Sequence, residues 1–170
     1  MLVLDYVWQV PTLASYNRAM RSVLGGWQWS SLLNVKSGEP VTVGLGVYAN
    51  AGEIDGPQRP NQTGSALDGK GLNDWINPSA FTVPAQATFG NARQGNVRLP
   101  RNTQVDSSLS KDFQIFERFR MQFKMEGINV FNHTEFSSVD NNFYPGSTTF
   151  GHLNNTLLPR TAQLGLHLLF

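Results

Sequence analysis

The chain has 170 residues, of which only 15% are charged, whereas globular proteins usually contain about 25% charged residues. Its 13 basic and 12 acidic residues nearly balance, so the charge gives no reason to expect nucleic acid as a partner. Cysteine is absent, which excludes disulfide frameworks, thiolate zinc sites and cysteine nucleophiles. The first residues do not resemble a secretory signal, and no stretch approaches the roughly 20 apolar residues of a membrane-spanning helix.

The first two predicted strands cover residues 1–10 and 27–45, where apolar side chains recur at every second position. This period is typical of strands with two unlike faces. In the second strand the alternation is interrupted at residues 37–40 and resumes at Val41. A connection of moderate length, residues 11–26, joins the two strands.

A hairpin is predicted next, from strands at residues 104–116 and 119–131 that are joined by the short polar connection 117–118. Both strands alternate clearly, although Ser107 and Lys111 weaken the apolar face of the first. After Gly127 the phase becomes unclear, which indicates a bulge or the end of the strand.

The last predicted strand, residues 160–170, shows the alternation most clearly. Leu169 is its only apolar side chain on the polar side. Two long segments, 46–103 and 132–159, are rich in Gly, Asn and Pro and carry little periodicity. Loops of this length count against a compact soluble domain. They are expected in an outer-membrane barrel, which has short periplasmic turns and long extracellular loops.

These patterns predict an all-β fold, in which antiparallel strands form a segment of a large outer-membrane β-barrel with long extracellular loops. Aromatic residues near the strand ends and a final strand that stops at Phe170 favour this reading. The alternative is a soluble, secreted β-sandwich that binds glycans, because sandwich strands also alternate. Its stacking platforms would be loop aromatics such as Trp75, Phe81 and Tyr144.

The barrel hypothesis assigns each alternating side chain to lipid or to the lumen. The predicted lipid-facing residues are Val105, Leu109, Phe113, Met121, Phe123, Met125, Leu164, Leu166, Leu168 and Phe170. The predicted lumen-facing residues are Asp106, Asp112, Arg120, Lys124, Glu126, Gln163 and His167.

No catalytic site is predicted, and the chain is not expected to be an enzyme. Asp112 and Glu126 could lie close enough for a glycosidase pair, but the nearby cations Lys111, Arg120 and Lys124 favour a lumen-facing ion-pair network. His133 and His152 could approach one another in the last long loop, yet no carboxylate stands at a metal-binding spacing. No cofactor is expected. Oxygen ligands that would permit a loop calcium site are Asn50, Glu53, Asp55, Asn61 and Asp68, without the spacing of an EF-hand.

Several motifs occur in an order that resembles the end of TonB-dependent receptors, and most of all the Oar-like group, which often carries a carboxypeptidase-regulatory-like domain. One segment is 118–136, in which Asn129, Val130, Phe131, Asn132 and His133 are followed by Phe136. The other matching segments are Leu24 to Trp27, Ser37 to Pro40, Arg59 to Asn61, Trp75 to Phe81, Phe89 to Ala92, Phe150 with Gly151, and Arg160 to Phe170. Each motif alone is weak, and the ordered set is what makes the resemblance specific.

The resemblance implies a transporter in the cell outer membrane, with a large closed barrel, an N-terminal plug and energy from the TonB complex. Substrates in this group are bulky and include glycans, peptides or proteins. The implied partners are outer-membrane lipid, the remaining strands and plug of the full-length protein, the TonB complex, and the barrel-assembly machinery that reads a terminal strand ending like Phe170. Five strands cannot enclose such a lumen, so the chain is expected to be a carboxyl-terminal fragment that does not transport by itself.

Overall fold

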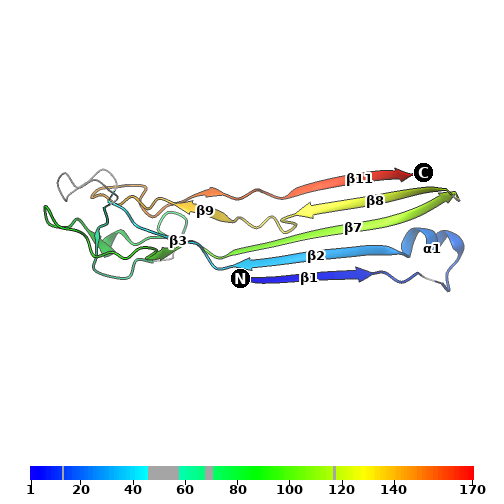
Figure 1. Cartoon of the computed structure of the whole chain (residues 1–170), viewed down its shortest axis with the longest axis horizontal. Coiled ribbons are helices and arrows are strands. Elements are labelled where there is room, and N and C mark those ends of the chain that lie inside the picture. The colour runs from blue at the N-terminus through cyan, green and yellow to red at the C-terminus, as the bar shows by residue number, and fades with distance from the viewer. Residues whose placement is uncertain (13, 46–57, 68–70, 117) are drawn as a thin grey trace. The chain divides into compact units, whose positions relative to one another are not determined.

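The computed structural model describes the chain except for residue 13, residues 46–57 and 68–70, and residue 117 (Figure 1). The chain divides into two compact units. The sheet unit comprises Met1–Lys36, Asn102–Thr134 and Leu158–Phe170. The loop unit comprises Ser37–Arg101 and Glu135–Leu157.

The sheet unit is built on one five-stranded sheet in which every neighbouring pair is antiparallel. The spatial order is β1-β2-β7-β8-β11, so β1 and β11 are the edge strands (Figure 1). The strands are β1 (Leu2–Gln9), β2 (Trp27–Lys36), β7 (Asn102–Phe116), β8 (Phe119–Ile128) and β11 (Thr161–Leu169). A short helix, α1 (Arg18–Leu24), lies between β1 and β2 in the chain.

The register of the sheet gathers the alternating apolar side chains on one face. Leu109 lies opposite Met125, and Met125 lies opposite Leu164, so three strands place apolar residues at the same level. We call this side the apolar face. Its members include Leu4, Tyr6, Trp8, Trp27, Trp29, Leu33, Val105, Leu109, Phe113, Met121, Phe123, Met125, Leu164, Leu166 and Leu168.

The two long stretches of chain between strands of the sheet, residues 37–101 and 129–160, each begin and end next to paired strand residues. Lys36, the last residue of β2, is the register partner of Asn102, the first residue of β7. Ile128 at the end of β8 is likewise the partner of Thr161 at the start of β11. The pairing of the strands is therefore uninterrupted on both sides of each long segment.

The turn that follows β8 is held by two asparagines with positive φ, a conformation that asparagine adopts more readily than most residues. The Asn129 side chain is buried and brackets the backbone of His133, donating from Nδ2 to its oxygen at 2.9 Å and accepting from its nitrogen at 3.0 Å. The Asn132 Oδ1 accepts from the backbone nitrogen of Arg160 at 3.2 Å.

The described residues of the loop unit form three short strand pairs and a 3-10 turn, η1 (Pro78–Ala80). Its strands are β3 (Pro40–Val41) with β6 (Val97–Arg98), β4 (Asn61–Gln62) with β5 (Phe81–Thr82), and β9 (Phe136–Val139) with β10 (Leu153–Thr156). Three aromatic rings meet in its core, because Phe150 lies 5.8 Å from Phe81 and 5.2 Å from Phe143 between ring centroids. The buried apolar residues are Val43, Leu45, Ala66, Ile76, Ala80, Phe81, Ala92, Val97, Leu99, Val139, Phe143 and Phe150.

One prediction about this region was wrong. The strand expected at residues 27–45 ends at Lys36, and Val43 and Leu45 belong to the core of the loop unit, where they are 0% and 1% exposed. The segments 46–103 and 132–159 were predicted to be long loops, and their described parts contribute to this packed core. The sheet unit ends just before the interruption at residues 37–40, where a Cβ at Gly38 would overlap the backbone carbonyl of Leu99.

Within the described residues, no helix has both the length and the apolar character needed to cross a membrane.

Candidate functional site

The apolar face of the sheet unit is open to the surroundings of the protein. Leu164, Leu166 and Leu168 are 68%, 66% and 66% exposed, although they lie in a regular strand. A soluble sandwich would bury this face against a second sheet. Among the described residues of the sheet unit no second sheet covers it. Exposed apolar area of this extent indicates a surface that another apolar medium or molecule covers.

The structure places the predicted lipid-facing residues on this one face. Val105, Leu109 and Phe113 share it with the β8 and β11 residues through the pairs Leu109 with Met125 and Met125 with Leu164. Phe170 follows the end of β11 and is 95% exposed. The contact of these side chains with lipid stays a prediction.

Lys111 stands on the apolar face, between Leu109 and Phe113 along β7, and it is only 5% exposed. Its Nζ donates to the backbone oxygen of Val23 at 3.2 Å and to that of Gly25, both in the turn that ends α1. The same nitrogen lies 5.0 Å from the Phe113 ring centroid and 5.4 Å from the Trp27 ring, within cation–π range. From the sequence, Lys111 was predicted to weaken the apolar face and to join a lumen-facing ion-pair network.

The opposite face of the sheet carries all the predicted lumen-facing residues. Asp106, Asp112, Arg120, Lys124, Glu126, Gln163 and His167 lie there, through pairs such as Gln163 with Glu126 and His167 with Gln122. Lys124 and Glu126 form an ion pair at 2.7 Å. Gln122 Nε2 donates to Asp112 Oδ1 at 2.9 Å. Asp112 thus accepts a hydrogen bond from an amide of the neighbouring strand.

The predicted ion-pair network therefore needs correction. Glu126 pairs in register with Ser108, whereas Asp112 pairs with Gln122, so the two carboxylates are not cross-strand neighbours. Lys111 lies on the other face, where aromatic rings and backbone carbonyls surround it. Parity along β7 separates Lys111 from its neighbour Asp112, because adjacent residues of a strand point to opposite faces.

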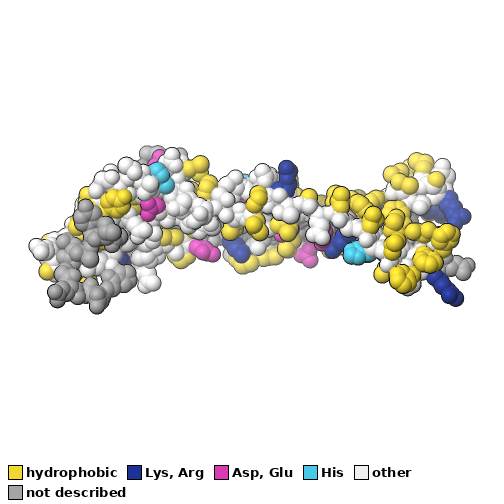
Figure 2. Space-filling model, turned by 90° about the horizontal axis from the view of Figure 1, so that it is seen from above, with side chains coloured by type: hydrophobic (Ala, Val, Ile, Leu, Met, Phe, Trp, Pro, Cys, Tyr) yellow, Lys and Arg dark blue, Asp and Glu magenta, His cyan; other side chains and the backbone are white. Residues whose placement is uncertain are grey.

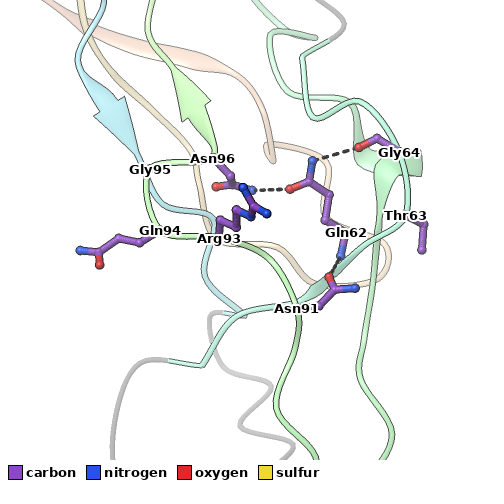
Figure 3. Close-up of a pocket in the computed structure, with 8 residues that line it drawn as sticks. All are labelled: Gln62, Thr63, Gly64, Asn91, Arg93, Gln94, Gly95 and Asn96. Atoms are coloured by element: carbon purple, nitrogen blue, oxygen red, sulfur yellow. Dashed lines mark hydrogen bonds between the residues drawn. The ribbon is translucent and has the colours of Figure 1, made fainter.

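The loop unit carries a second feature, an open polar hollow of about 610 Å³. Figure 3 shows the side chains of Gln62, Arg93 and Asn96 pointing toward one another across it. Its lining residues are Gln62, Thr63, Gly64, Asn91, Arg93, Gln94, Gly95 and Asn96. Because amides and one guanidinium dominate this lining, the hollow suits a ligand that forms hydrogen bonds.

A ladder of amide contacts fixes the shape of this hollow. Asn91 Oδ1 accepts from the backbone nitrogen of Gln62 at 2.7 Å, and Asn61 Oδ1 accepts from that of Asn91 at 3.1 Å. Asn96 Nδ2 donates to Gln62 Oε1 at 3.0 Å, while its own Oδ1 accepts from the backbone nitrogen of Val43 at 3.2 Å. The side chains that line the hollow are therefore held before any ligand arrives.

Two sequence motifs of the loop unit pack against each other and support the hollow. Gly90 lies so close to the backbone of Arg59 and Pro60 that any Cβ there would overlap their carbonyl groups. Ala92 donates from its backbone nitrogen to the Pro60 oxygen at 3.1 Å. Two motifs far apart in the sequence, Arg59 to Asn61 and Phe89 to Ala92, therefore form one joint at the base of the hollow.

Comparison with protein families gives the observation that decides the class. Residues 1–163 match the family model described as "Outer membrane beta barrel domain". The chain belongs to the outer membrane beta barrel domain family. Comparisons with curated proteins and with solved structures gave no match.

Membership of the outer membrane beta barrel domain family explains the uncovered face. The protein resides in the outer membrane, where lipid associates with the barrel surface. The all-β, antiparallel fold predicted from the alternation is confirmed. The apolar face is the surface of this family member that suits contact with lipid, and the polar face is the one that suits an aqueous lumen.

Other candidate residues of this barrel-family chain are placed as follows. Phe81 is buried in the core, so the prediction that it forms an open stacking platform is wrong. Trp75 is partly buried against this core and donates from Nε1 to the Arg98 oxygen at 2.8 Å. His133 belongs to the sheet unit and His152 to the loop unit. Within the described residues, no group of three or more His, Asp or Glu side chains is arranged to hold a metal ion. The oxygen ligands Asn50, Glu53, Asp55 and Asp68 of the calcium hypothesis lie outside the described residues, and Asn61 accepts from Asn91.

Proposed function

We propose that the chain forms the carboxyl-terminal strands of a TonB-dependent transporter of the Oar-like group, which moves a bulky substrate across the outer membrane. One observation carries the proposal: a sheet with a continuous apolar face has two edges, β1 and β11, that pair with no further strand of the described residues. A strand edge in lipid needs hydrogen-bond partners, and a barrel supplies them by closing on itself. We propose that further strands and a plug of the same protein complete the barrel.

The motifs shared with the Oar-like group support the finer assignment to TonB-dependent transport. The Asn129 to His133 segment holds the turn after β8, and the Arg59 to Asn61 and Phe89 to Ala92 segments form the joint below the polar hollow. Within these segments, Gly90, Asn129 and Asn132 occupy positions where the backbone geometry tolerates few replacements. Their ordered recurrence supports descent from a transporter of this group, with the TonB complex and the barrel-assembly machinery as partners.

We propose that the loop unit captures the substrate at its polar hollow. A lining of amide and guanidinium groups favours a neutral or weakly anionic ligand with many hydrogen-bonding groups, such as a glycan or a peptide backbone. The open shape suits one part of a large ligand. We also propose a binding and transport role without catalysis, which is supported by the absence of a Gly-x-Ser-x-Gly elbow from the sequence.

The test uses an affinity tag inserted at Gly146, around which there is open space in the loop unit. Cells that carry the tag in their native gene are fractionated, and the tagged polypeptide is purified from detergent-solubilised outer membranes. We expect a polypeptide longer than 170 residues that cross-links to TonB in energised cells. A long polypeptide without this cross-link would refute TonB dependence, and a 170-residue product in the aqueous fraction would refute barrel closure by further strands.

A further inference from the structure

Helix α1 has the composition of a segment that lies at a charged membrane surface. Asn17 begins the helix, since its Oδ1 accepts from the backbone nitrogen of Met20 at 2.8 Å, and Gly25 ends it. Between Pro11 and Gly26 the sequence contains two arginines and no acidic residue. Neither Arg18 nor Arg21 forms an ion pair with any described residue. The helix therefore presents uncompensated positive charge.

The apolar residues of α1 share one side of the helix. Met20, Val23 and Leu24 are spaced three and four positions apart, which places them on one face, and they are 41%, 59% and 50% exposed. Arg18 and Arg21 are also three positions apart, and their common direction lies well over 90° around the helix axis from the apolar face by helical geometry. A helix with this arrangement lies in the plane of a membrane interface.

The sheet holds α1 on the side of its apolar face. Trp27 Nε1 donates to the Val23 oxygen at 2.8 Å, and Lys111 Nζ donates to the same oxygen at 3.2 Å. Trp27 and Lys111 are register partners on the apolar face. The Trp27 ring also contacts Phe113 and Phe123, with centroids 6.4 and 5.8 Å away. The helix is thereby tied to the apolar face, the surface that suits contact with lipid.

Helix α1 lies at one end of the strands, the region of a barrel that meets the membrane–water boundary (Figure 1). Figure 1 shows α1 at the end of the sheet where the β7–β8 turn and the carboxyl terminus also lie. In Figure 2 this right-hand end gathers hydrophobic and basic side chains next to one another. Aromatic residues and cations together are typical of the membrane–water boundary, where rings lie at headgroup level and arginines meet phosphates.

We propose that α1 is a lipid-binding element of the barrel, with Arg18 and Arg21 contacting the phosphates of anionic phospholipids and Met20, Val23 and Leu24 inserted among the acyl chains. Lys111 acts as the positioning residue, because its ammonium ties the carbonyl end of α1 to the apolar face. The inference rests on the lipid contact of the apolar face and not on TonB dependence.

The test exploits the absence of cysteine from the chain. Met20→Cys and, separately, Leu166→Cys are labelled with an environment-sensitive dye in the protein reconstituted into vesicles. One set of vesicles contains phosphatidylcholine alone, and the other contains equal parts of phosphatidylcholine and phosphatidylglycerol. We expect the dye at position 20 to shift to the blue only with phosphatidylglycerol, and high salt to reverse the shift. The dye at position 166 should be blue-shifted equally in both.

Charge variants then decide the role of the arginines. In Arg18→Gln/Arg21→Gln the shift at position 20 should lose its dependence on phosphatidylglycerol, since two near-surface cations change partitioning roughly 30-fold. The matched control Arg101→Gln/Arg160→Gln removes two exposed arginines that lie just before β7 and β11, and it should keep the full shift. If the position-20 dye shows no blue shift while the position-166 dye does, the proposal for α1 is overturned and the lipid contact of the apolar face still stands. Loss of both shifts would refute the lipid contact on which it rests.

Discussion

The two units of this chain treat the same kinds of apolar side chain in opposite ways. In the loop unit Val43 and Ile76 are 0% exposed, as expected for a protein core in water. In the sheet unit Leu164 and Leu166 are more than half exposed, although their strand is regular. The difference shows which solvent each unit is built for. The loop unit excludes water from its own interior, whereas the sheet unit leaves its apolar side to an outside medium.

The largest effect is expected when an aromatic ring is removed from the core of the loop unit, which tests whether that unit is stabilised by a buried core. Phe150→Ala should cost about 3–5 kcal/mol, because Phe150 is 4% exposed and packs against two other phenylalanine rings. Hydrogen exchange of the loop-unit amides in the full chain measures the change. Phe89→Ala in the same unit is the control, and it should have little effect because Phe89 is 69% exposed. Equal loss of protection in both variants would contradict the assigned core.

The next largest effect is expected on the apolar face of the sheet. Leu166→Arg should cost roughly 2–4 kcal/mol when the protein folds into a bilayer, because a charge near mid-strand would face hydrocarbon. Gln163→Arg on the opposite face should be mild. Denaturant titration of the vesicle-bound protein gives both values. The proposed facing fails if the two variants are tolerated equally.

A smaller loss of stability is expected in the turn after β8, where two variants distinguish the contribution of the backbone conformation from that of the hydrogen bonds. Asn129→Ala should lose about 1–3 kcal/mol, because it removes both bonds to the His133 backbone and leaves a non-glycine residue at φ 52°. Asn129→Gly keeps the conformation accessible and should lose less. The same titration compares the two variants, and identical losses would show that the positive φ contributes nothing.

The smallest effect concerns the ion pair on the polar face. Lys124→Gln should change stability by roughly 0–1 kcal/mol, since both side chains of the pair with Glu126 are partly exposed, at 40% and 45%. Repeating the titration at high salt should remove even this difference. A loss well above this range, insensitive to salt, would restore the idea of an extended ion-pair network.

The fold of the sheet unit could be predicted because its signal is local. A period of two is visible within ten residues, and it carries the all-β class and the shared face of Val105, Leu109 and Phe113 without knowledge of the partner strands. The core of the loop unit has no such period. Its contacts join distant motifs, as where Gly151, with φ 84°, lies against the backbone of Ile76. A single sequence shows these residues only as separate turn signals.

The role of Lys111 could not be predicted for a similar reason. Its carbonyl partner Gly25 is 86 positions away in the chain, and the pairing of β2 with β7 brings the two together. A signal for α1 itself was present in Asn17, a helix-starting residue, and in Gly25 and Gly26 after the last helical residue. Seven residues make only about two helical turns, too short for a helical period to stand out between two strongly alternating strands.

The paired exits of the long segments have a consequence for how such a protein can diversify. Because Lys36 faces Asn102 and Ile128 faces Thr161, replacing either excursion by a short turn leaves every strand pair in register. Lengthening a long segment also costs little stability, since doubling the length of a loop raises its closure free energy by only about 0.6 kcal/mol. The two long segments, and the ligand preference that they carry, can therefore change in evolution without altering the strand pairing. The membrane-embedded scaffold would meanwhile evolve under constraints of its own.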